Sequence, residues 1–385
     1  MDKLTVAKEK FEENVKSELA RIAKMKEQKE LLDFCQLDKV IIGVVDGDGI
    51  GPIIMEQAKR IIDLLLNIEI KRGIVEVRII EGLTIENRSQ QMKSVPDEVL
   101  DQLKKCHVIL KGPTTTPRAG DPWPNLPSAN ATLRRELDLF ANIRPVRVPE
   151  EGIDWVFFRE NIEGAYILGS KGIEVDEDLA IDFVVTTSIG SERIARAAFE
   201  YARNNGKTNV TAVTKANIVK LTDGNFLKAC KKVALEYPGI ELQERLVDVV
   251  AAKLADKEFN QGLEVFVLPN LYGDIISDIA AEYQGGLGTA GSANVGNRYG
   301  LFEAIHGTAP FLVKNGRAKY ADPSSVLRAL VMLLRHIGYI NKSAKLEEAL
   351  DICTKKEKKI CVTSDRDGAS AEEFTDYIID TIRSL

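Results

Sequence analysis

Short apolar runs that alternate with longer helical patterns are the feature that most restricts how this chain can fold. Each run has the length and composition of a buried strand, and a helical pattern over 52–66 follows the first one. The runs occupy residues 39–45, 75–80, 108–111, 155–158, 210–213 and 265–268. Because alternating strands and helices pack as layers on one sheet, this order predicts an α/β protein with a largely parallel or mixed sheet.

The size and charge of the chain narrow the functional classes. Its 385 residues suffice for two domains or one large α/β unit. The formal net charge of −6 argues against general nucleic-acid binding, although a local basic pocket can still hold a small anion. No apolar run approaches the roughly 18–20 residues that span a bilayer, so we expect no membrane partner.

The cysteines and the N-terminus indicate a cytoplasmic protein. The five cysteines are scattered and form no C-x-x-C pair, which argues against a disulfide framework or a zinc site and suits a reducing compartment. Residues 1–20 mix acidic and basic side chains without an apolar core, unlike a secretory signal, and their glutamates disfavour a transit peptide.

Residues 1–38 form a charged segment without glycine or proline, which predicts a helix ahead of the main body. Its apolar side chains recur at near-helical spacing, at Leu4, Phe11, Val15, Leu19, Ile22 and Met25. Charged amphipathic helices usually rest on a protein surface, so we expect an appended helix that packs on the body or on a partner subunit. A regulatory role is the alternative.

A glycine-rich turn follows the first strand. Gly47, Gly49 and Gly51 are spaced G-x-G-x-G, which departs from the G-x-G-x-x-G fingerprint of a Rossmann dinucleotide site. A plain tight turn and a phosphate-binding turn therefore both remain open.

Three arginines and a polar helix start point to an anionic ligand. Ser128 is a candidate N-cap, and Asn130 and Arg134 lie four residues apart, so they share one helix face. Arg144 and Arg159 each follow an apolar run. Guanidinium groups bind carboxylates through two parallel hydrogen bonds, so the set suits a polyanionic substrate, whereas surface salt bridges are the alternative for any single arginine.

The segment NLYGDIISD places Asp274 and Asp278 four residues apart at the start of a predicted helix. Both carboxylates then project from one face, an arrangement that holds Mg²⁺ or Mn²⁺ together with substrate oxygens and water. Two aspartates that complement the helix dipole are the alternative.

Six motifs together carry a family resemblance. In chain order they read GDGIGP, LRRELDLFANIRPVR, FFRENIEGAY, TKANIVKLTDGNF, NLYGDIISD and EAIHGTAP. From residue 39 to the C-terminus the chain resembles the isocitrate/isopropylmalate dehydrogenase family of metal-dependent decarboxylating dehydrogenases, and most closely its isocitrate-specific members.

The resemblance implies a two-domain α/β/α fold that differs from the Rossmann fold. It divides the chain into an N-terminal helical extension at 1–38, a large cofactor-side domain at 39–140 and 285–385, and a small domain at 141–284. The small domain would carry the metal ligands and the interface of a homodimer with shared active sites, and a higher oligomer is compatible with that interface.

The resemblance also assigns roles to residues. It implies Lys215 and Tyr166 as catalytic base and acid, and Asp248, Asp274 and Asp278 as ligands of Mg²⁺ or Mn²⁺, with Lys215 and Asp248 given by the other subunit. It implies substrate binding by Thr116, Ser128, Asn130, Arg134, Arg144 and Arg159. It implies cofactor binding by Asn217, Glu303, His306, Gly307, Thr308, Ala309 and Asp322.

The implied reaction is the oxidation of isocitrate, a step of the tricarboxylic acid cycle. The metal would lower the pKa of the 2-hydroxyl, hydride would pass to NAD(P)⁺, CO₂ would leave, and Tyr166 would protonate the enolate. Ser128 and Asn130 favour isocitrate, since isopropylmalate enzymes place apolar residues on this helix and an unpaired polar pair would weaken binding. Homoisocitrate and 3-isopropylmalate are alternative substrates, and a non-catalytic regulatory subunit is the alternative to an enzyme.

The resemblance favours NAD over NADP as cofactor, although NADP remains possible. Phe311 and Leu312 stand where NADP-dependent relatives place the Lys-Tyr pair that binds the 2′-phosphate. The alternative is an NADP site in which the 2′-phosphate is bound from new positions, by Lys314, Arg317, Lys319 and Arg366.

Overall fold

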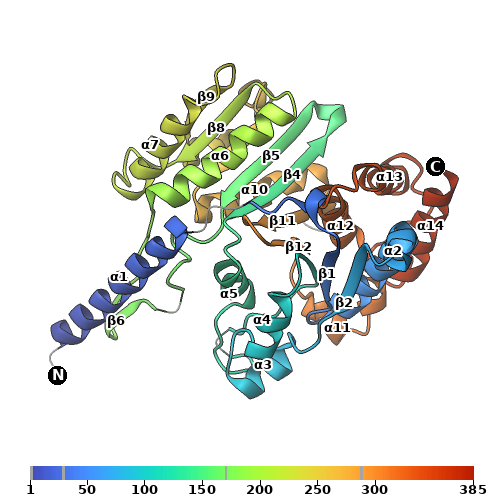
Figure 1. Cartoon of the computed structure of the whole chain (residues 1–385), viewed down its shortest axis with the longest axis horizontal. Coiled ribbons are helices and arrows are strands. Elements are labelled where there is room, and N and C mark those ends of the chain that lie inside the picture. The colour runs from blue at the N-terminus through green and yellow to red at the C-terminus, as the bar shows by residue number, and fades with distance from the viewer. Residues whose placement is uncertain (1–2, 28–30, 119, 170, 287–288) are drawn as a thin grey trace. The chain divides into compact units, whose positions relative to one another are not determined.

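The computed structural model describes residues 3–27, 31–118, 120–169, 171–286 and 289–385, and it consists of two compact units (Figure 1). Unit 1 comprises Met1–Leu31 and Phe140–Ala280. Unit 2 comprises Leu32–Leu139 and Ala281–Leu385. The chain thus leaves unit 1 after its first segment, builds part of unit 2, and returns.

Five strands of unit 2 pair in the order β2–β1–β3–β12–β11. Their bounds are β1 Val40–Val45, β2 Val75–Ile79, β3 Val108–Lys111, β11 Gly291–Val295 and β12 Gly300–Ala304. The first four run parallel, and β11 runs antiparallel to β12. The register pairs Lys111 with Glu303 on neighbouring strands, which sets a cation beside an anion inside the sheet.

Helices cover the sheet of unit 2. They are α2 Gly51–Lys71, α3 Ile85–Gln91, α4 Asp97–Leu103, α5 Ala129–Glu136, α11 Pro310–Lys314, α12 Ser324–His336, α13 Ile340–Asp351 and α14 Ala371–Ser384. Proline stands in the first turn of α2, where its missing N–H is not needed. The apolar face of α12 packs against β11 and β12, and its buried leucines lie in the core.

Unit 1 has five further strands in the order β4–β5–β10–β8–β9. They are β4 Ala141–Val148, β5 Ile153–Glu160, β8 Asn209–Thr214, β9 Glu241–Leu246 and β10 Val265–Leu268. Its helices are α1 Lys3–Glu27, α6 Ser188–Asn204, α7 Thr222–Ala234, α8 Val247–Lys253, α9 Lys257–Asn260 and α10 Asn270–Ala281. Among these five strands, β4 runs antiparallel to β5, and β5, β10, β8 and β9 pair in parallel.

Alternating side chains of β5 fill both faces of the sheet of unit 1. Phe158 and its partners on β10 pack under α6, where Ile194 and Phe199 are fully buried. On the opposite face the rings of Phe157 and Phe266 stack with centroids 4.5 Å apart. Burial on both faces explains why β5 reads as a continuous apolar run in the sequence.

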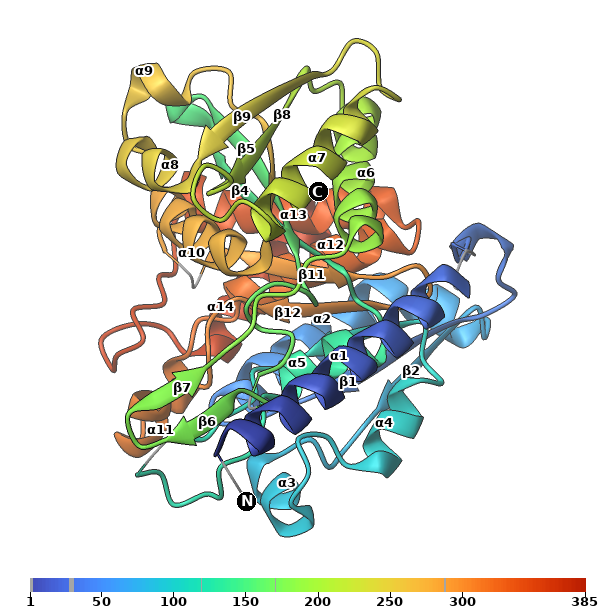
Figure 2. The ribbon, with the colours of Figure 1, turned by 90° about the vertical axis from the view of Figure 1, so that its left-hand side faces the viewer.

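A hairpin of β6 Ile173–Asp176 and β7 Leu179–Ile181 projects from unit 1, and α1 lies alongside β6 (Figure 2). The expected N-terminal helix is therefore confirmed over Lys3–Glu27. It does not continue to residue 38, because Phe34–Gln36 forms a 3₁₀ turn in which the Asp33 side chain accepts a hydrogen bond from Cys35 N.

The mixed α/β architecture predicted from the sequence is confirmed, with an N-terminal helical extension. In the part of the chain that the structure describes, no helix has both the length and the apolar character needed to cross a bilayer.

Candidate active site

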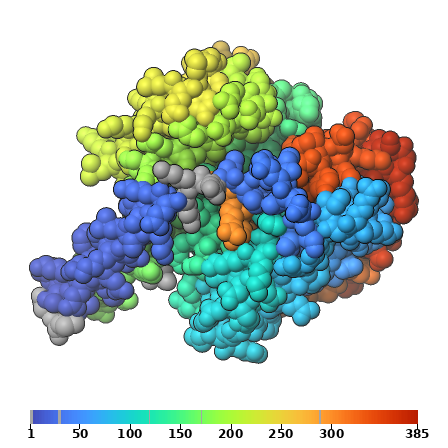
Figure 3. Space-filling view, viewed as in Figure 1, coloured from blue at the N-terminus to red at the C-terminus, as the bar shows by residue number. Residues whose placement is uncertain are grey.

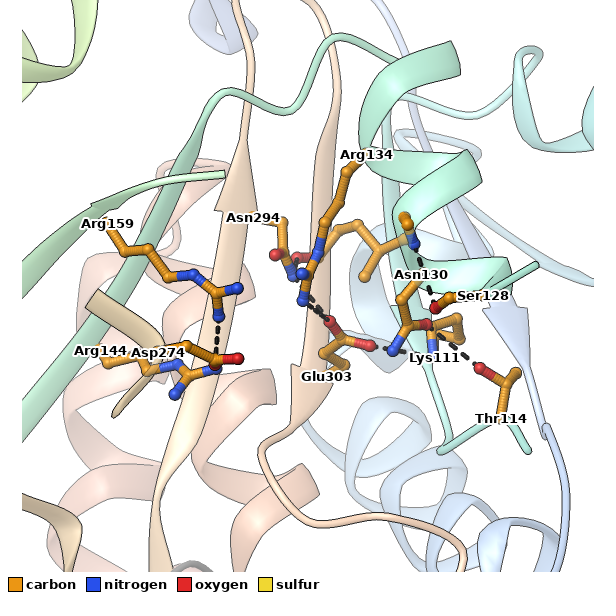
Figure 4. A network of polar contacts seen from close by, with 12 residues as sticks. Lys111, Thr114, Ser128, Asn130, Arg134, Arg144, Arg159, Asp274, Asn294 and Glu303 are labelled. Carbon is orange, nitrogen blue, oxygen red and sulfur yellow. Dashed lines mark hydrogen bonds and ion pairs between the residues drawn. The ribbon is translucent and has the colours of Figure 1, made fainter. Parts of the chain in front are cut away.

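Two arginines of unit 1 converge on two aspartates of α10, and Figure 4 shows both arginines beside the first of these, Asp274. Arg144 lies on β4 and donates to Asp278 Oδ1 at 2.6 Å and to Asp274 Oδ1 at 3.2 Å. Arg159 lies on β5 and donates to Asp274 as well. Asp274 and Asp278 are one helical turn apart, so the predicted shared face of the helix is confirmed.

The start of α10 holds Arg159 in place. Asn270 Oδ1 accepts hydrogen bonds from Arg159 Nε at 2.9 Å and from Arg159 Nη2 at 2.7 Å. A Cβ at Gly273 would lie 2.6 Å from Arg159 Cγ, so only glycine lets the helix approach this buried side chain. The guanidinium is therefore fixed from two sides before any ligand arrives.

The electrostatics of this cluster suit a bound cation. Burial raises the pKa of the Asp278 carboxyl, Arg144 opposes the shift, and the nearby Asp274 carboxylate adds to it. Two close carboxylates destabilise each other's charge, and a divalent cation relieves that repulsion. The donor set, two hard carboxylate oxygens on one helix face, fits Mg²⁺ or Mn²⁺.

Tyr166 joins the same cluster. Its hydroxyl donates to Asp274 Oδ2 at 3.2 Å, and the guanidinium carbon of Arg159 lies 5.6 Å from the centre of its ring. The phenol oxygen thus points to the aspartate that also receives Arg159. A phenol, a carboxylate and a guanidinium group therefore meet within unit 1.

Lys215 and Asp248 form a separate pair in unit 1. Lys215 follows β8, and its Nζ lies 2.7 Å from Asp248 Oδ1. Asp223 fixes the loop by accepting a hydrogen bond from Lys215 N at 2.6 Å. Asp223 also acts on Tyr272, where burial and the Asp223 carboxylate together raise the pKa of the Tyr272 hydroxyl to about 12. Among the described residues no group of three or more histidine, cysteine, aspartate or glutamate side chains is placed to hold a metal, so Asp248 does not join Asp274 and Asp278 within one chain.

Unit 2 contributes a buried cluster around Glu303, which Figure 4 shows on β12. Lys111 Nζ lies 2.9 Å from Glu303 Oε2, and Arg134 Nη2 lies 3.5 Å from Oε1. Asn294 Nδ2 donates to Oε1 at 3.0 Å. Glu303 therefore orients Arg134 from inside the sheet.

The start of α5 carries the polar pair predicted to select the substrate. Ser128 is the N-cap, as expected, and its hydroxyl accepts from Ala131 N at 3.4 Å. Asn130 Oδ1 accepts from Thr114 Oγ1 at 3.1 Å, which directs the amide NH₂ away from Thr114. Thr116 is exposed in the loop after β3.

The predicted cofactor residues fall in three places. The loop from His306 to Ala309 follows β12 and packs on the glycine turn, since Ile50 N donates to Thr308 O at 3.2 Å. A Cβ at Gly49, whose φ is +62°, would lie 2.2 Å from that same carbonyl oxygen. Asp322 accepts from Ser324 N at 2.8 Å, and burial raises its pKa. Asn217 lies exposed in unit 1.

Comparisons with known proteins agree with this geometry. The Isocitrate/isopropylmalate dehydrogenase family matches residues 41–382. The chain belongs to this family. It is 37% identical over 352 residues to subunit 2 of the mitochondrial isocitrate dehydrogenase (NAD) of Schizosaccharomyces pombe, covering 89% of this chain and 87% of that protein.

An isocitrate dehydrogenase (NADP) of Rickettsia prowazekii is 37% identical over 317 residues, covering 80% of this chain and 62% of that protein. The crystal structure of isocitrate dehydrogenase from Methylococcus capsulatus superposes with a TM-score of 0.77 at 33% identity, covering 89% of this chain and 99% of that one. Relatives of this dehydrogenase family thus include both NAD and NADP forms.

Four residues that support the site in this family member were missed at the level of sequence. Lys111 and Asn294 hold Glu303. Glu163 holds the 160–166 segment, and Asn270 holds Arg159. Asn270 and Glu163 lie inside quoted motifs, so proximity to Asp274 and Tyr166 was an available signal. Asn294 offered none, because only the antiparallel pairing of β11 with β12 brings it to Glu303.

Proposed function

We propose that this family member catalyses the oxidative decarboxylation of isocitrate to 2-oxoglutarate and CO₂ with reduction of NAD(P)⁺. One observation carries the proposal: Arg144 and Arg159 converge on a pair of aspartates that fits a divalent metal, with Tyr166 in contact. This arrangement suits a polyanionic substrate that chelates a metal. The names of the relatives agree with isocitrate as that substrate.

Asp274 and Asp278 would hold Mg²⁺ or Mn²⁺. When bound, the metal supplies Lewis-acid chemistry that favours loss of the 2-hydroxyl proton and stabilises negative charge as CO₂ leaves. Arg144 and Arg159 now pair with these aspartates, and they would turn to the substrate carboxylates once a cation takes their place.

The side chains of the chain move the protons. Lys215 accepts the proton of the 2-hydroxyl as hydride passes from C2 to nicotinamide C4. Loss of CO₂ then leaves an enolate, and the Tyr166 hydroxyl donates its proton to the enolate carbon. Arg159, clamped by Asn270, keeps the substrate carboxylate in register between the two proton transfers.

A homodimer with shared sites accounts for the separation of Lys215 and Asp248 from the other catalytic groups. Within one chain these two residues pair with each other rather than with Asp274. Their counterparts from a second copy would complete the site of each subunit, and higher oligomers can be built from such dimers.

Isocitrate is favoured over 3-isopropylmalate by the start of α5. The Asn130 carboxamide and the Ser128 hydroxyl are polar, and an isopropyl group would leave them without partners. A third carboxylate can accept a hydrogen bond from the Asn130 NH₂. Homoisocitrate also has this carboxylate and differs by one methylene, so it is the second candidate substrate.

NAD is the favoured cofactor, with NADP as the alternative. Arg317 is engaged: its Nη2 donates to Ser364 O at 2.8 Å and lies 2.8 Å from Asp365 Oδ2. Lys59, Lys319 and Arg366 line a cleft of about 730 Å³ that also contains Asp46, Glu56, Glu372 and Glu373, and Lys59 Nζ lies 2.9 Å from Asp46 Oδ1. The carboxylates outnumber the cations, which opposes binding of a 2′-phosphate.

A reducing compartment such as the cytoplasm suits the chain. Each of its five cysteines is a free thiol, and Cys35 and Cys361 are exposed. Exposed thiols persist without pairing where the compartment keeps them reduced.

The test is an assay of the purified full chain with Mn²⁺ against isocitrate, homoisocitrate and 3-isopropylmalate, with NAD⁺ and NADP⁺ supplied separately. We expect the highest kcat/KM for isocitrate with NAD⁺. Absence of turnover on all three substrates would instead support a non-catalytic regulatory subunit. Lys215→Met is expected to block hydride transfer, and Tyr166→Phe to spare reduction of added oxalosuccinate while slowing release of protonated product.

A further inference from the structure

The N-terminal helix α1 places a buried arginine beside the segment that carries Tyr166. Arg21 Nη2 lies 2.8 Å from Glu163 Oε1, and the two side chains are 15% and 3% exposed. The helix stands before residue 41, where the family match begins, so this contact comes from a part of the chain outside that match.

Arg21 is clamped by its own helix. Its Nε donates to Glu18 at 2.8 Å, and its Nη1 lies 2.9 Å from the sulfur of the buried Met25. Only Nη2 extends to Glu163. The side chain is therefore oriented before it meets its partner, which limits the conformational entropy lost in the contact.

Glu163 needs this cation because a second carboxylate is buried next to it. Burial and the neighbouring Glu163 raise the pKa of Glu160, whereas the charge of Arg193 lowers it. A Cβ at Gly190 would lie 2.5 Å from Glu163 Oε1, so the pocket is closed on that side. Arg21 is the ion-pair partner of Glu163, so loss of Arg21 leaves the Glu163 carboxylate out of water without its counter-ion.

Glu163 in turn connects α1 to the catalytic cluster. Its side chain accepts from Thr187 N at 2.7 Å and from Thr187 Oγ1 at 2.6 Å, while its main-chain O accepts from Asn270 Nδ2 at 2.8 Å. Asn270 holds Arg159 through its other amide atom. The path from Arg21 to Arg159 therefore runs through one ion pair and two hydrogen-bonded residues.

We propose that Arg21 is a positioning residue: it neutralises buried Glu163 and thereby fixes the segment 159–166, which presents Arg159 and Tyr166 to the substrate. The N-terminal extension is then part of the active-site scaffold rather than a separate appendage. The inference rests on the proposed function for the identity of the substrate, although the contact itself does not depend on it.

Further contacts tie α1 to the rest of unit 1 independently of Arg21, and Figure 3 shows the surface of this helix in dark blue. Asn14 Nδ2 donates to Lys171 O at 3.1 Å, Lys3 Nζ lies 3.0 Å from Asp176 Oδ2, and the rings of Phe11 and Phe183 have centroids 5.7 Å apart. Substitution of Arg21 alone is therefore expected to leave the helix docked, so that the ion pair is tested by itself.

The experiment compares Arg21→Gln and Arg21→Lys with the control Lys24→Gln, which removes the same charge from an exposed position on the same helix. For Arg21→Gln we expect kcat/KM for isocitrate to fall about tenfold or more, with KM for the nicotinamide cofactor within about twofold of the wild type. Arg21→Lys is expected to lose less activity than Arg21→Gln, since lysine keeps the positive charge but lacks the planar set of N–H donors of the guanidinium group. Lys24→Gln is expected to match the wild type.

Hydrogen exchange of the ligand-free protein provides a second measurement. Peptides covering 158–168 are expected to exchange faster in Arg21→Gln and unchanged in Lys24→Gln, because local opening reports lost contacts. Wild-type kinetics together with wild-type exchange in Arg21→Gln would overturn the inference. If the wild type fails to oxidise isocitrate, the proposed function fails, and exchange still decides the role of Arg21 because it needs no substrate. If Arg21→Gln does not fold, the double variant Arg21→Gln with Glu163→Gln is expected to fold, because it removes the buried anion together with its cation, and failure of the double variant to fold would overturn the inference.

Discussion

Each unit of the molecule buries a glutamate on a strand, and the two glutamates have opposite surroundings. In unit 2, Glu303 of β12 faces Lys111 and Arg134. In unit 1, Glu160 ends β5 next to a second carboxylate, Glu163. Burial would raise the pKa of Glu303, but the adjacent Lys111 and Arg134 charges outweigh it and lower the pKa. Burial and Glu163 together raise the pKa of Glu160 to about 8.

The difference shows how each unit balances its charge. Unit 2 neutralises its buried glutamate with cations of its own sheet and of α5, so that cluster is complete without a ligand. Unit 1 places carboxyl groups beside each other: Glu160 with Glu163, and Asp274 with Asp278. Arg21 of the N-terminal helix pairs with Glu163. Arg144 and Arg159 pair with the two aspartates, so we expect the aspartates to need a divalent metal once the substrate takes these arginines.

The largest expected effect follows from removing a proposed metal ligand of unit 1. Asp274→Asn should lower kcat with isocitrate and Mn²⁺ by about 10³-fold or more, since Lewis-acid stabilisation contributes several kcal/mol to such a reaction. Chelation by EDTA should abolish turnover, and added Mg²⁺ or Mn²⁺ should restore it. Steady-state kinetics and a titration of Mn²⁺ binding measure the two effects.

The matched control is Asp178→Asn, which changes an exposed aspartate of unit 1. It is expected to keep wild-type activity. Full activity of a thoroughly chelated wild type would break the comparison, because Asp274 and Asp278 would then act without a divalent cation.

The second prediction concerns the buried Glu303 cluster of unit 2, whose charges are balanced within that unit. Glu303→Gln leaves Lys111 buried without its counter-ion, and loss of one partner of a buried pair typically destabilises a protein by about 3–5 kcal/mol. The double variant Lys111→Met with Glu303→Gln should recover part of that loss. Urea unfolding followed by circular dichroism measures both, and equal stability of the single variant and the wild type would contradict the account.

The fold was largely predictable because its strands are buried on both faces. Runs such as 108–111 and 265–268 coincide with β3 and β10, since a strand covered on both sides must be apolar throughout. The antiparallel strands β4 and β11 were not foreseen. Arg144 alternates with apolar residues along β4, and Gly291 and Asn294 of β11 belong to residue types that are depleted in strands.

The site was predictable only where residues act from one helix face. The four-residue spacing of Asp274 and Asp278 sets their proximity, and the Ser128 N-cap follows from the residue type. The Arg21–Glu163 pair joins residues 142 positions apart, and no local pattern encodes such a contact. Charge balance between segments that are distant in the sequence can therefore be seen only in the structure.

The third prediction concerns the neutral polar pair of unit 2, Ser128 and Asn130. Its substitution is expected to change the rate less than substitution in the charged cluster of unit 1. Asn130→Leu removes an amide expected to bind the third carboxylate, and a hydrogen bond to a charged group contributes about 1.5–3 kcal/mol. We expect kcat/KM for isocitrate to fall by roughly 10- to 150-fold, while activity with 3-isopropylmalate rises or is unchanged. Glu136→Gln, on an exposed position of the same helix, is the control. An unchanged ratio of the two substrates would place specificity elsewhere.

The smallest expected effect is a pH dependence that only unit 1 contributes. The folded-state pKa of Glu160 lies above its unfolded value of 4.5, so the folded protein binds an extra proton between that value and about pH 8. Its buried Oε1 has no hydrogen-bond partner among the described residues, which also favours the protonated acid. Stability from this group is fully present below the unfolded pKa and is lost as pH rises through the folded one.

Between about pH 6.5 and pH 7.5 the free energy of unfolding should therefore fall by at most about 1.4 kcal/mol, the value for one proton per pH unit. Glu160→Gln is expected to remove this slope, because the amide does not titrate. Glu303→Gln should keep the slope although it lowers overall stability, since the Glu303 carboxyl, whose pKa is lowered by Lys111 and Arg134 despite its burial, is ionised in both states across this range. Urea unfolding at both pH values measures the slopes, and an equal slope in the wild type and Glu160→Gln would show that Glu160 stays ionised in the folded unit, held so by Arg193 and Arg21.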